Sequence, residues 1–212
     1  KKLARTIKRQ DILDALDDVN VTQTENAELQ TVTLEDFLKW RNKTLGIGGK
    51  LHGNSSLDTR KAWLWAFSMQ IVYGLRISEV FAIKNLTEPY VTSDGKPILA
   101  LNDPVNADNL IYIGAKTNLG TTVKTGSRIA RPLIPPKHFN LIEDLEIKFP
   151  LVPTNIPDGG SSNSIRRFYA AVARKILLKW DAPFTQTHAL RHLANINGIQ
   201  AGIPQEVRAQ SL

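Results

Sequence analysis

The fold is organised around a run of apolar residues that ends in an arginine. Residues 62–80 read AWLWAFSMQIVYGLRISEV. Apolar side chains fall on nearly every side of a helix drawn through the first part of this run, which predicts a buried helix. Arg76 then lies at the end of a core element, where a guanidinium is suited to hold a planar anion through two parallel hydrogen bonds. An internal ion pair with Glu79, three residues later, explains the arginine equally well.

The composition is that of an ordinary globular protein with an excess of positive charge. The chain has 212 residues, no cysteine and a formal net charge of +7. The lack of cysteine excludes disulfides, thiolate metal ligands and cysteine nucleophiles. No apolar run reaches membrane-spanning length, and the first residues lack the apolar core of a signal peptide. We therefore expect no membrane partner and a cytoplasmic location.

Acidic and basic residues are unevenly distributed along the chain. Acids are absent from residues 109–142, 159–180 and 182–205. A concentrated positive field of this kind attracts nucleic-acid phosphates, although a solvated basic surface without a ligand is the alternative. The basic residues of the three stretches are Lys116, Lys124, Arg128, Arg131, Lys137, Arg166, Arg167, Arg174, Lys175, Lys179 and Arg191.

The pattern of apolar and turn-forming residues predicts a mainly helical α+β protein with a small antiparallel β-sheet. Strands are predicted over residues 98–101, 110–113 and 128–133. The loop between the second and third strands holds Lys116 and Lys124 and can project a lysine into a cleft. Helices are predicted over residues 9–18, from the cap Thr33 to the glycines that follow Leu45, up to Arg76 with a continuation over 77–85, over 163–180, through His188 to Gly202, and after Pro204.

A third candidate motif lies on the late helix that carries His188, Arg191 and His192. His188 and Arg191 share one helix face, so that one can exchange a proton near neutral pH while the other holds an anion. His188 and His192 are spaced to share a zinc ion, which makes a metal hydrolase an alternative. Ala189 stands where the zincin signature has glutamate, and no third ligand is evident, so we expect neither metal nor cofactor.

Taken together and in this order, the motifs resemble the catalytic domain of tyrosine recombinases, the phage-integrase family. Residues 73–80 resemble the first arginine box of the family, and residues 124–133 resemble its lysine hairpin. Residues 187–192 are similar to the second box, and residues 201–212 are similar to the segment that leads into the third. The resemblance implies the family's fold for residues 56–212, as a catalytic domain incomplete at its C-terminus. Residues 1–55 would be its helical lead-in or an interdomain linker.

The resemblance implies metal-free transesterification of a DNA phosphodiester through a 3′-phosphotyrosyl intermediate. Arg76 and Arg191 would hold the non-bridging oxygens of the scissile phosphate. Lys124 would protonate the leaving 5′ oxygen, and His188 would assist proton removal from the attacking tyrosine. The residues expected in supporting roles are Glu79, which would orient Arg76, Lys116 as the alternative lysine, and His192. Those expected to contact DNA are Arg128, Arg131, Arg166 and Arg167.

The sequence departs from the family at its end. Relatives continue with Gly-His and then the nucleophilic tyrosine, whereas the tyrosines of this chain are Tyr73, Tyr90, Tyr112 and Tyr169. We therefore expect the central piece of a longer site-specific recombinase, which binds double-stranded DNA but is inactive alone. The full-length protein would act as a homo-tetramer on paired sites. The alternatives are a catalytically inactive DNA-binding relative and a type IB topoisomerase or telomere resolvase.

Overall fold

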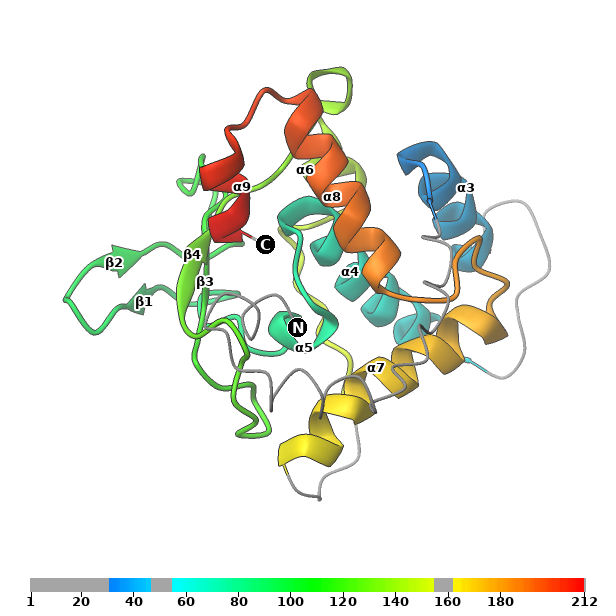
Figure 1. The fold of residues 1–212 in the computed structure, drawn as a ribbon, viewed down its shortest axis with the longest axis horizontal. Helices are drawn as coiled ribbons and strands as arrows, with labels where there is room; N and C mark the ends of the chain where they lie inside the picture. The colour runs from blue at the N-terminus through cyan, green and yellow to red at the C-terminus, as the bar shows by residue number, and fades with distance from the viewer. Residues whose placement is uncertain (1–30, 47–54, 155–161, 212) are drawn as a thin grey trace, which may run out of the picture.

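The apolar run forms α4, Leu57–Tyr73, in the computed structural model of this protein (Figure 1). Every residue from Ala62 to the end of the helix is buried, as expected for a helix that is apolar on nearly all sides. The side chain of Ser56 caps its start, and Gly74, in the left-handed conformation at φ 67°, ends it. Arg76 therefore lies just beyond the helix rather than in its last turn.

The structure describes residues 31–46, 55–154 and 162–211, without the side chains of residues 162–167 and 210–211. The helix predicted over residues 9–18 lies outside these ranges. Besides α4, the elements in chain order are α3 (Leu34–Leu45), α5 (Ile77–Val80), β1 (Tyr90–Val91), β2 (Pro97–Ile98), β3 (Ile111–Ile113), β4 (Arg128–Ala130), a 3-10 turn (Pro136–His138), α6 (Leu141–Asp144), α7 (Ser162–Lys179), α8 (His188–Gln200) and α9 (Gln205–Ser211).

The described part of the chain is mainly helical with two small antiparallel sheets, which confirms the α+β, mainly α class. The helices predicted from Thr33, over residues 163–180, from His188 and after Pro204 are all present. Thr33 caps α3 as predicted, because its hydroxyl accepts a hydrogen bond from the N–H of Asp36 at 3.1 Å. Within the described ranges, no helix combines the length and apolarity needed to cross a membrane.

The predicted helix over residues 77–85 is wrong beyond its first turn. Helix α5 ends at Val80, and the chain then runs beside β3, where the N–H of Lys84 donates to the carbonyl of Tyr112 at 2.9 Å. The buried amide of Asn85 donates to the carbonyls of Leu99 and Leu110 and accepts from the N–H of Tyr112. The Lys84 N–H, which a continued helix would have paired locally, is thus satisfied by a long-range hydrogen bond instead.

The prediction of one small sheet is also wrong. Strands β1 and β2 pair with each other, and β3 and β4 form a separate pair in which Ile111 lies opposite Ala130. Strand β1 was not predicted, and β4 ends at Ala130, short of the predicted residue 133. Pro132 has no N–H to donate, so the ladder cannot continue through it.

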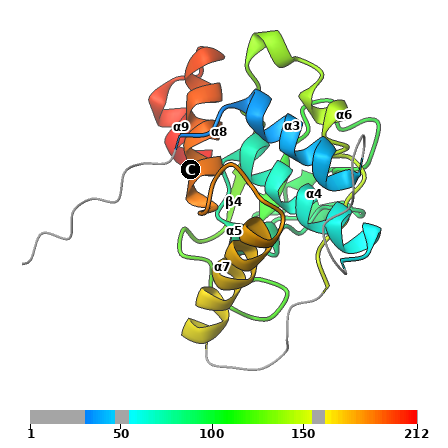
Figure 2. The same cartoon turned by 90° about the vertical axis from the view of Figure 1, so that its right-hand side faces the viewer.

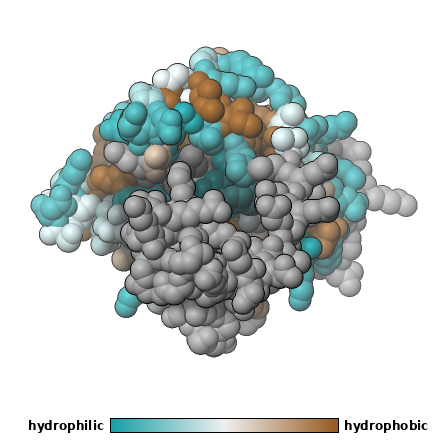
Figure 3. Space-filling model, viewed as in Figure 1, coloured by the Kyte–Doolittle hydropathy of each residue, from teal (hydrophilic) through white to brown (hydrophobic). Residues whose placement is uncertain are grey.

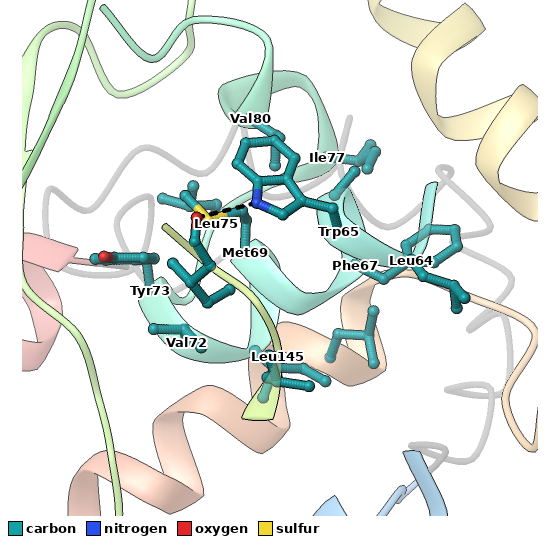
Figure 4. Close-up of a cluster of buried hydrophobic side chains, with 14 of the residues drawn as sticks. Leu64, Trp65, Phe67, Met69, Val72, Tyr73, Leu75, Ile77, Val80 and Leu145 are labelled. Atoms are coloured by element: carbon teal, nitrogen blue, oxygen red, sulfur yellow. Dashed lines mark hydrogen bonds between the residues drawn. The ribbon is translucent and has the colours of Figure 1, made fainter. Parts of the chain in front are cut away.

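The core surrounds α4, which contacts α3, α5 and α8 (Figures 1 and 2). Side chains of α4 such as Trp65 and Met69 gather with Leu75 and Leu145 in one buried cluster (Figure 4). Helix α3 belongs to the same core: the indole N–H of Trp40 donates to the carbonyl of Trp180 at 2.7 Å. The N-terminal region from residue 31 therefore packs with the rest of the described chain.

Some hydrophobic surface remains exposed between hydrophilic regions (Figure 3). Helix α8 contributes Ile196 and Ile199, which are 43% and 56% exposed, and α9 contributes Val207. Isolated apolar side chains on a surface are common in folded proteins, so these residues by themselves indicate no partner.

Candidate functional site

Arg76 is held in the short connection between α4 and α5. Its backbone is extended, at φ −71° and ψ 150°, and it occupies the N-cap position of α5. The carboxylate of Glu79 accepts a hydrogen bond from the Arg76 N–H at 2.8 Å and another from its guanidinium at 3.0 Å. The ion pair considered as an alternative from the sequence is therefore present. One third of the Arg76 side chain, 34%, nevertheless remains exposed and can meet a ligand.

Glu79 is the centre of a larger charged cluster. Its side chain is 1% exposed, and besides Arg76 it accepts hydrogen bonds from Arg128 at 3.0 Å and from the hydroxyl of Thr125 at 2.9 Å. Arg191 lies 3.9 Å away. Burial by itself raises the pKa of Glu79. The hydrogen bond and charge of Arg128, together with hydrogen bonds from the Arg76 backbone and Thr125, outweigh burial and lower the pKa below the ordinary glutamate value. The carboxylate is therefore ionised at neutral pH.

The cluster contains more positive than negative charge. One carboxylate faces three guanidinium groups, those of Arg76, Arg128 and Arg191. Among the described residues, Nη1 of Arg191 has no hydrogen-bond partner although it is buried. Burial and then the charge of Arg76 lower the pKa of Arg191 to about 10, so it remains a cation at neutral pH. A buried cation without full compensation is costly, and an anion that enters the site would relieve that cost.

Four predicted site residues line one cavity of about 240 Å³. They are Arg76 from the α4–α5 connection, Lys124 from the loop before β4, and His188 and Arg191 from the first turn of α8. This volume is several times the roughly 30 Å³ that a water molecule occupies in the liquid. The structure thus brings together, beside a small open space, groups that are far apart in the sequence.

His188 lies where it can accept a proton from a molecule in the cavity. Burial lowers the pKa of His188, and the neighbouring His192 and two arginines lower it further, so the imidazole is neutral at pH 7. The His188 and His192 rings meet edge to face, with their centroids 4.6 Å apart. His192 is not among the residues that line the cavity. Within the described residues, no three His, Cys, Asp or Glu side chains come together as metal ligands.

The structure distinguishes the two candidate lysines. Lys124 lines the cavity. Lys116 lies in the same loop but forms an antiparallel bridge with Thr122 and is not among the cavity-lining residues. The geometry therefore favours Lys124 for any role in the cavity.

The basic residues expected to contact DNA have different surroundings. Arg128 is not on the surface, because its side chain is 13% exposed and is hydrogen-bonded to Glu79. Arg131 is exposed just after β4. Arg166 and Arg167 lie in α7, with side chains outside the described set. Sequence reasoning thus missed that Arg128 points inward, because its partner Glu79 is distant in the sequence.

No tyrosine lines the cavity. Tyr73 is fully buried, its hydroxyl donates to the carbonyl of Asn109 at 2.7 Å, and burial raises its pKa. The buried ring of Tyr169 stacks on Phe81. The two remaining tyrosines, Tyr90 and Tyr112, stack on each other at 4.7 Å.

Comparisons of the chain with models of protein families, with curated proteins and with solved structures found no match. The indications of function in this chain are therefore its own sequence motifs and the groups that line the cavity.

Proposed function

We propose that this chain is the catalytic region of a site-specific DNA recombinase of the tyrosine recombinase type, with the fold of that family. In this proposal the cavity holds the scissile phosphodiester of double-stranded DNA. The observation that carries it is the convergence of Arg76, Lys124, His188 and Arg191 on one cavity. These are the four residues for which the family resemblance implies catalytic roles.

The charge of the site suits a phosphodiester in particular. Arg76 and Arg191 can donate to the two non-bridging oxygens, and planar guanidinium groups match the geometry of a phosphate. Negative charge on those oxygens grows as phosphorus becomes five-coordinate, so fixed cations stabilise the transition state more than the ground state. Glu79 offsets only one of the three arginine charges, which leaves the site positive before DNA binds.

His188 and Lys124 would transfer protons in the proposed reaction. The attacking oxygen forms a bond to phosphorus as the bond from phosphorus to the 5′ oxygen breaks. Neutral His188 would take the proton of the attacking hydroxyl, and Lys124 would give a proton to the departing 5′ oxygen. The chemistry then needs neither a metal ion nor a nucleotide cofactor.

The attacking tyrosine is proposed to come from outside this chain, because none of its four tyrosines lines the cavity. The chain itself would bind, orient and polarise the phosphodiester. Assembly as a tetramer on paired DNA sites, which the family resemblance implies, is part of the same proposal for the full-length protein.

A joining reaction tests the proposal without a tyrosine. The substrate is a nicked duplex with randomised flanks, in which one strand ends in a 3′-(4-nitrophenyl) phosphate beside a strand with a free 5′-hydroxyl. The 5′ oxygen attacks phosphorus and 4-nitrophenolate leaves, while the hydroxyl proton passes to the amine of Lys124, the reverse of its role in cleavage. We expect joining and release of nitrophenolate above the uncatalysed rate. Lys39→Ala, which removes an exposed charge from α3, should leave the rate unchanged. A chain that neither binds nor joins this DNA would contradict the proposal.

A catalytically inactive DNA-binding relative is the second candidate. The observation that favours it is the lack of a tyrosine at the cavity. It predicts salt-dependent binding to the nicked duplex with no release of nitrophenolate, so the same experiment separates the two candidates.

A further inference from the structure

Two residues of the lysine loop and the strand that follows it reach the centre of the charged cluster. The Thr125 hydroxyl donates to Oε1 of Glu79 at 2.9 Å, and Arg128 donates to Oε1 at 3.3 Å and to Oε2 at 3.0 Å. Arg128 also donates to the Thr125 oxygen. A hydroxyl has one hydrogen to give and lone pairs to accept with, so Thr125 can make both contacts at once. Each of Glu79, Thr125 and Arg128 is therefore hydrogen-bonded to the other two.

Both the backbone and the guanidinium of Arg128 are held in place. Its backbone belongs to β4 and lies opposite the buried Ile113 of β3. Its guanidinium uses both terminal nitrogens on Glu79, and 13% of the side chain is exposed. A DNA contact would require it to leave a buried carboxylate, which is unfavourable. Arg131 is exposed, so it is better placed to meet a phosphate.

The hydrogen bonds connect the two halves of the proposed site. Thr125 directly follows Lys124, so anchoring Thr125 restricts where the lysine can lie. On the other side, Glu79 holds Arg76 through both its backbone N–H and its guanidinium. Arg128 contacts both Glu79 and Thr125, and so lies between the lysine and the arginine that meet at the cavity.

We propose that Arg128 is a positioning residue. It holds Glu79 and the Lys124 loop together, so that Arg76, Arg191 and Lys124 contact the same phosphodiester. This inference rests on the proposed function. It assigns Arg128 a role in the transfer step and not in DNA affinity.

The position of Arg191 indicates what the loss of Arg128 would do. Arg191 is 3.9 Å from Oε2 of Glu79, the oxygen that Arg128 contacts at 3.0 Å. Without Arg128, Arg191 becomes the nearest replacement partner for the buried carboxylate. It would move toward Glu79 and away from the cavity, and Thr125 would lose one of its contacts.

The test measures the joining rate at saturating DNA and, separately, the dissociation constant for the nicked duplex. Arg128→Ala should lower the saturated rate by roughly 10- to 100-fold, the range observed when a supporting partner of a metal ligand is removed, which is a comparable positioning role. The dissociation constant should stay within about twofold, and Arg128→Lys should recover part of the rate because it keeps the charge without the planar fork. In a Glu79→Gln background, Arg128→Ala should have little further effect, because both changes remove one interaction.

A direct DNA contact predicts the opposite result. Arg128→Ala would then weaken binding and reduce the salt dependence by one phosphate contact, as we expect for Arg131→Ala. That outcome, or effects of Arg128→Ala and Glu79→Gln that simply multiply, would overturn the inference. If Arg128→Ala does not fold, as judged by circular dichroism, Thr125→Val provides the test: it should lower the saturated rate severalfold without changing affinity, and an unchanged rate would overturn the inference.

The two proposals fail in different ways. If the unaltered protein joins no DNA, the proposed function fails, and a role for Arg128 in transfer fails with it. If the unaltered protein joins DNA and Arg128→Ala joins it equally fast, only the role of Arg128 is lost.

Discussion

Within the part of the chain that the structure describes, two clusters place a largely buried arginine opposite a glutamate beside a cavity, and they differ in charge balance. Arg41 pairs with Glu146 at 3.0 Å beside a cavity of about 550 Å³, which Lys61, Lys148 and Asp58 also line. Three cations there face two carboxylates. At Glu79, three arginines and the nearby Lys124 face one carboxylate beside a cavity of about 240 Å³.

Of these two cavities, the smaller one has the greater excess of positive charge around it. Glu146 is 63% exposed, so water screens the Arg41 pair and can solvate its carboxylate. Glu79 is 1% exposed and its surroundings are fixed by protein groups. The smaller cavity is therefore where a bound anion would be stabilised most.

The largest expected difference between the clusters is in catalysis. Arg191→Ala should lower the joining rate by roughly 10²- to 10³-fold, the usual effect of removing one donor to a transition-state oxygen. Arg41→Ala should leave the rate per folded molecule unchanged, since Arg41 is not at the cavity proposed to hold the phosphodiester. Release of nitrophenolate measures both variants. Equal losses would mean that the charge balance does not distinguish the proposed site from the Arg41 cluster.

The next difference is in stability. Glu79→Gln leaves three arginines around a buried neutral group, and removing one partner of a buried ion pair typically costs about 3 kcal/mol or more. Glu146→Gln removes an exposed partner and should cost less than about 1 kcal/mol. Urea unfolding followed by circular dichroism measures both changes. Equal unfolding free energies for the two variants would show that Glu79 is not held as the structure indicates.

A smaller difference is expected in anion binding. Inorganic phosphate should stabilise the protein through the Glu79 cluster, by about 0.4 kcal/mol when its concentration equals the dissociation constant. Arg41→Ala should keep this stabilisation and Arg191→Ala should lose it, as measured by thermal unfolding with and without phosphate. Retention of the effect in Arg191→Ala and its loss in Arg41→Ala would assign anion binding to the larger cavity.

The smallest expected effect is on the titration of His188. Cations oppose protonation of a neighbouring imidazole, so the pKa of His188 should lie below the ordinary 6.5 in the unaltered protein. Arg191→Gln removes one of these cations and should raise the pKa. In the proposed cleavage step, attack by a tyrosine that gives its proton to neutral His188 would accordingly slow as the pH drops through this lowered pKa. NMR titration of the imidazole signals provides the measurement, and a pKa that does not rise in Arg191→Gln would contradict this electrostatic coupling.

The helices could be predicted from sequence because their signals are local. The buried run of α4, the cap Thr33 of α3 and the stop at Gly202 after α8 each depend on residues within a turn or two. The failure after Val80 has a different origin. Asn85 hydrogen-bonds to Leu99, Leu110 and Tyr112, and these contacts are not encoded in the periodicity of residues 77–85.

In the candidate site, too, local features could be predicted from the sequence and long-range contacts could not. Helix periodicity placed His188 and Arg191 on one face, but their grouping with Arg76 and Lys124 was expected only through the family resemblance, since no periodicity relates positions so far apart. Arg128 was expected to contact DNA because it belongs to the basic, acid-free stretches of the chain. Its actual partner, Glu79, is 49 residues away in the sequence. A buried carboxylate that collects several arginines can be identified only once the fold has brought them together.

The way α3 packs has a practical consequence for dissecting this protein. Trp40 lies against Phe67 of α4 at 6.1 Å and against Phe184 at 5.6 Å between ring centroids. A shortened version that begins at residue 56 would uncover these aromatic rings, and exposed surfaces of this kind promote aggregation. Expression of this protein for biochemical work should therefore retain α3, even though the motifs on which the family resemblance rests begin after it.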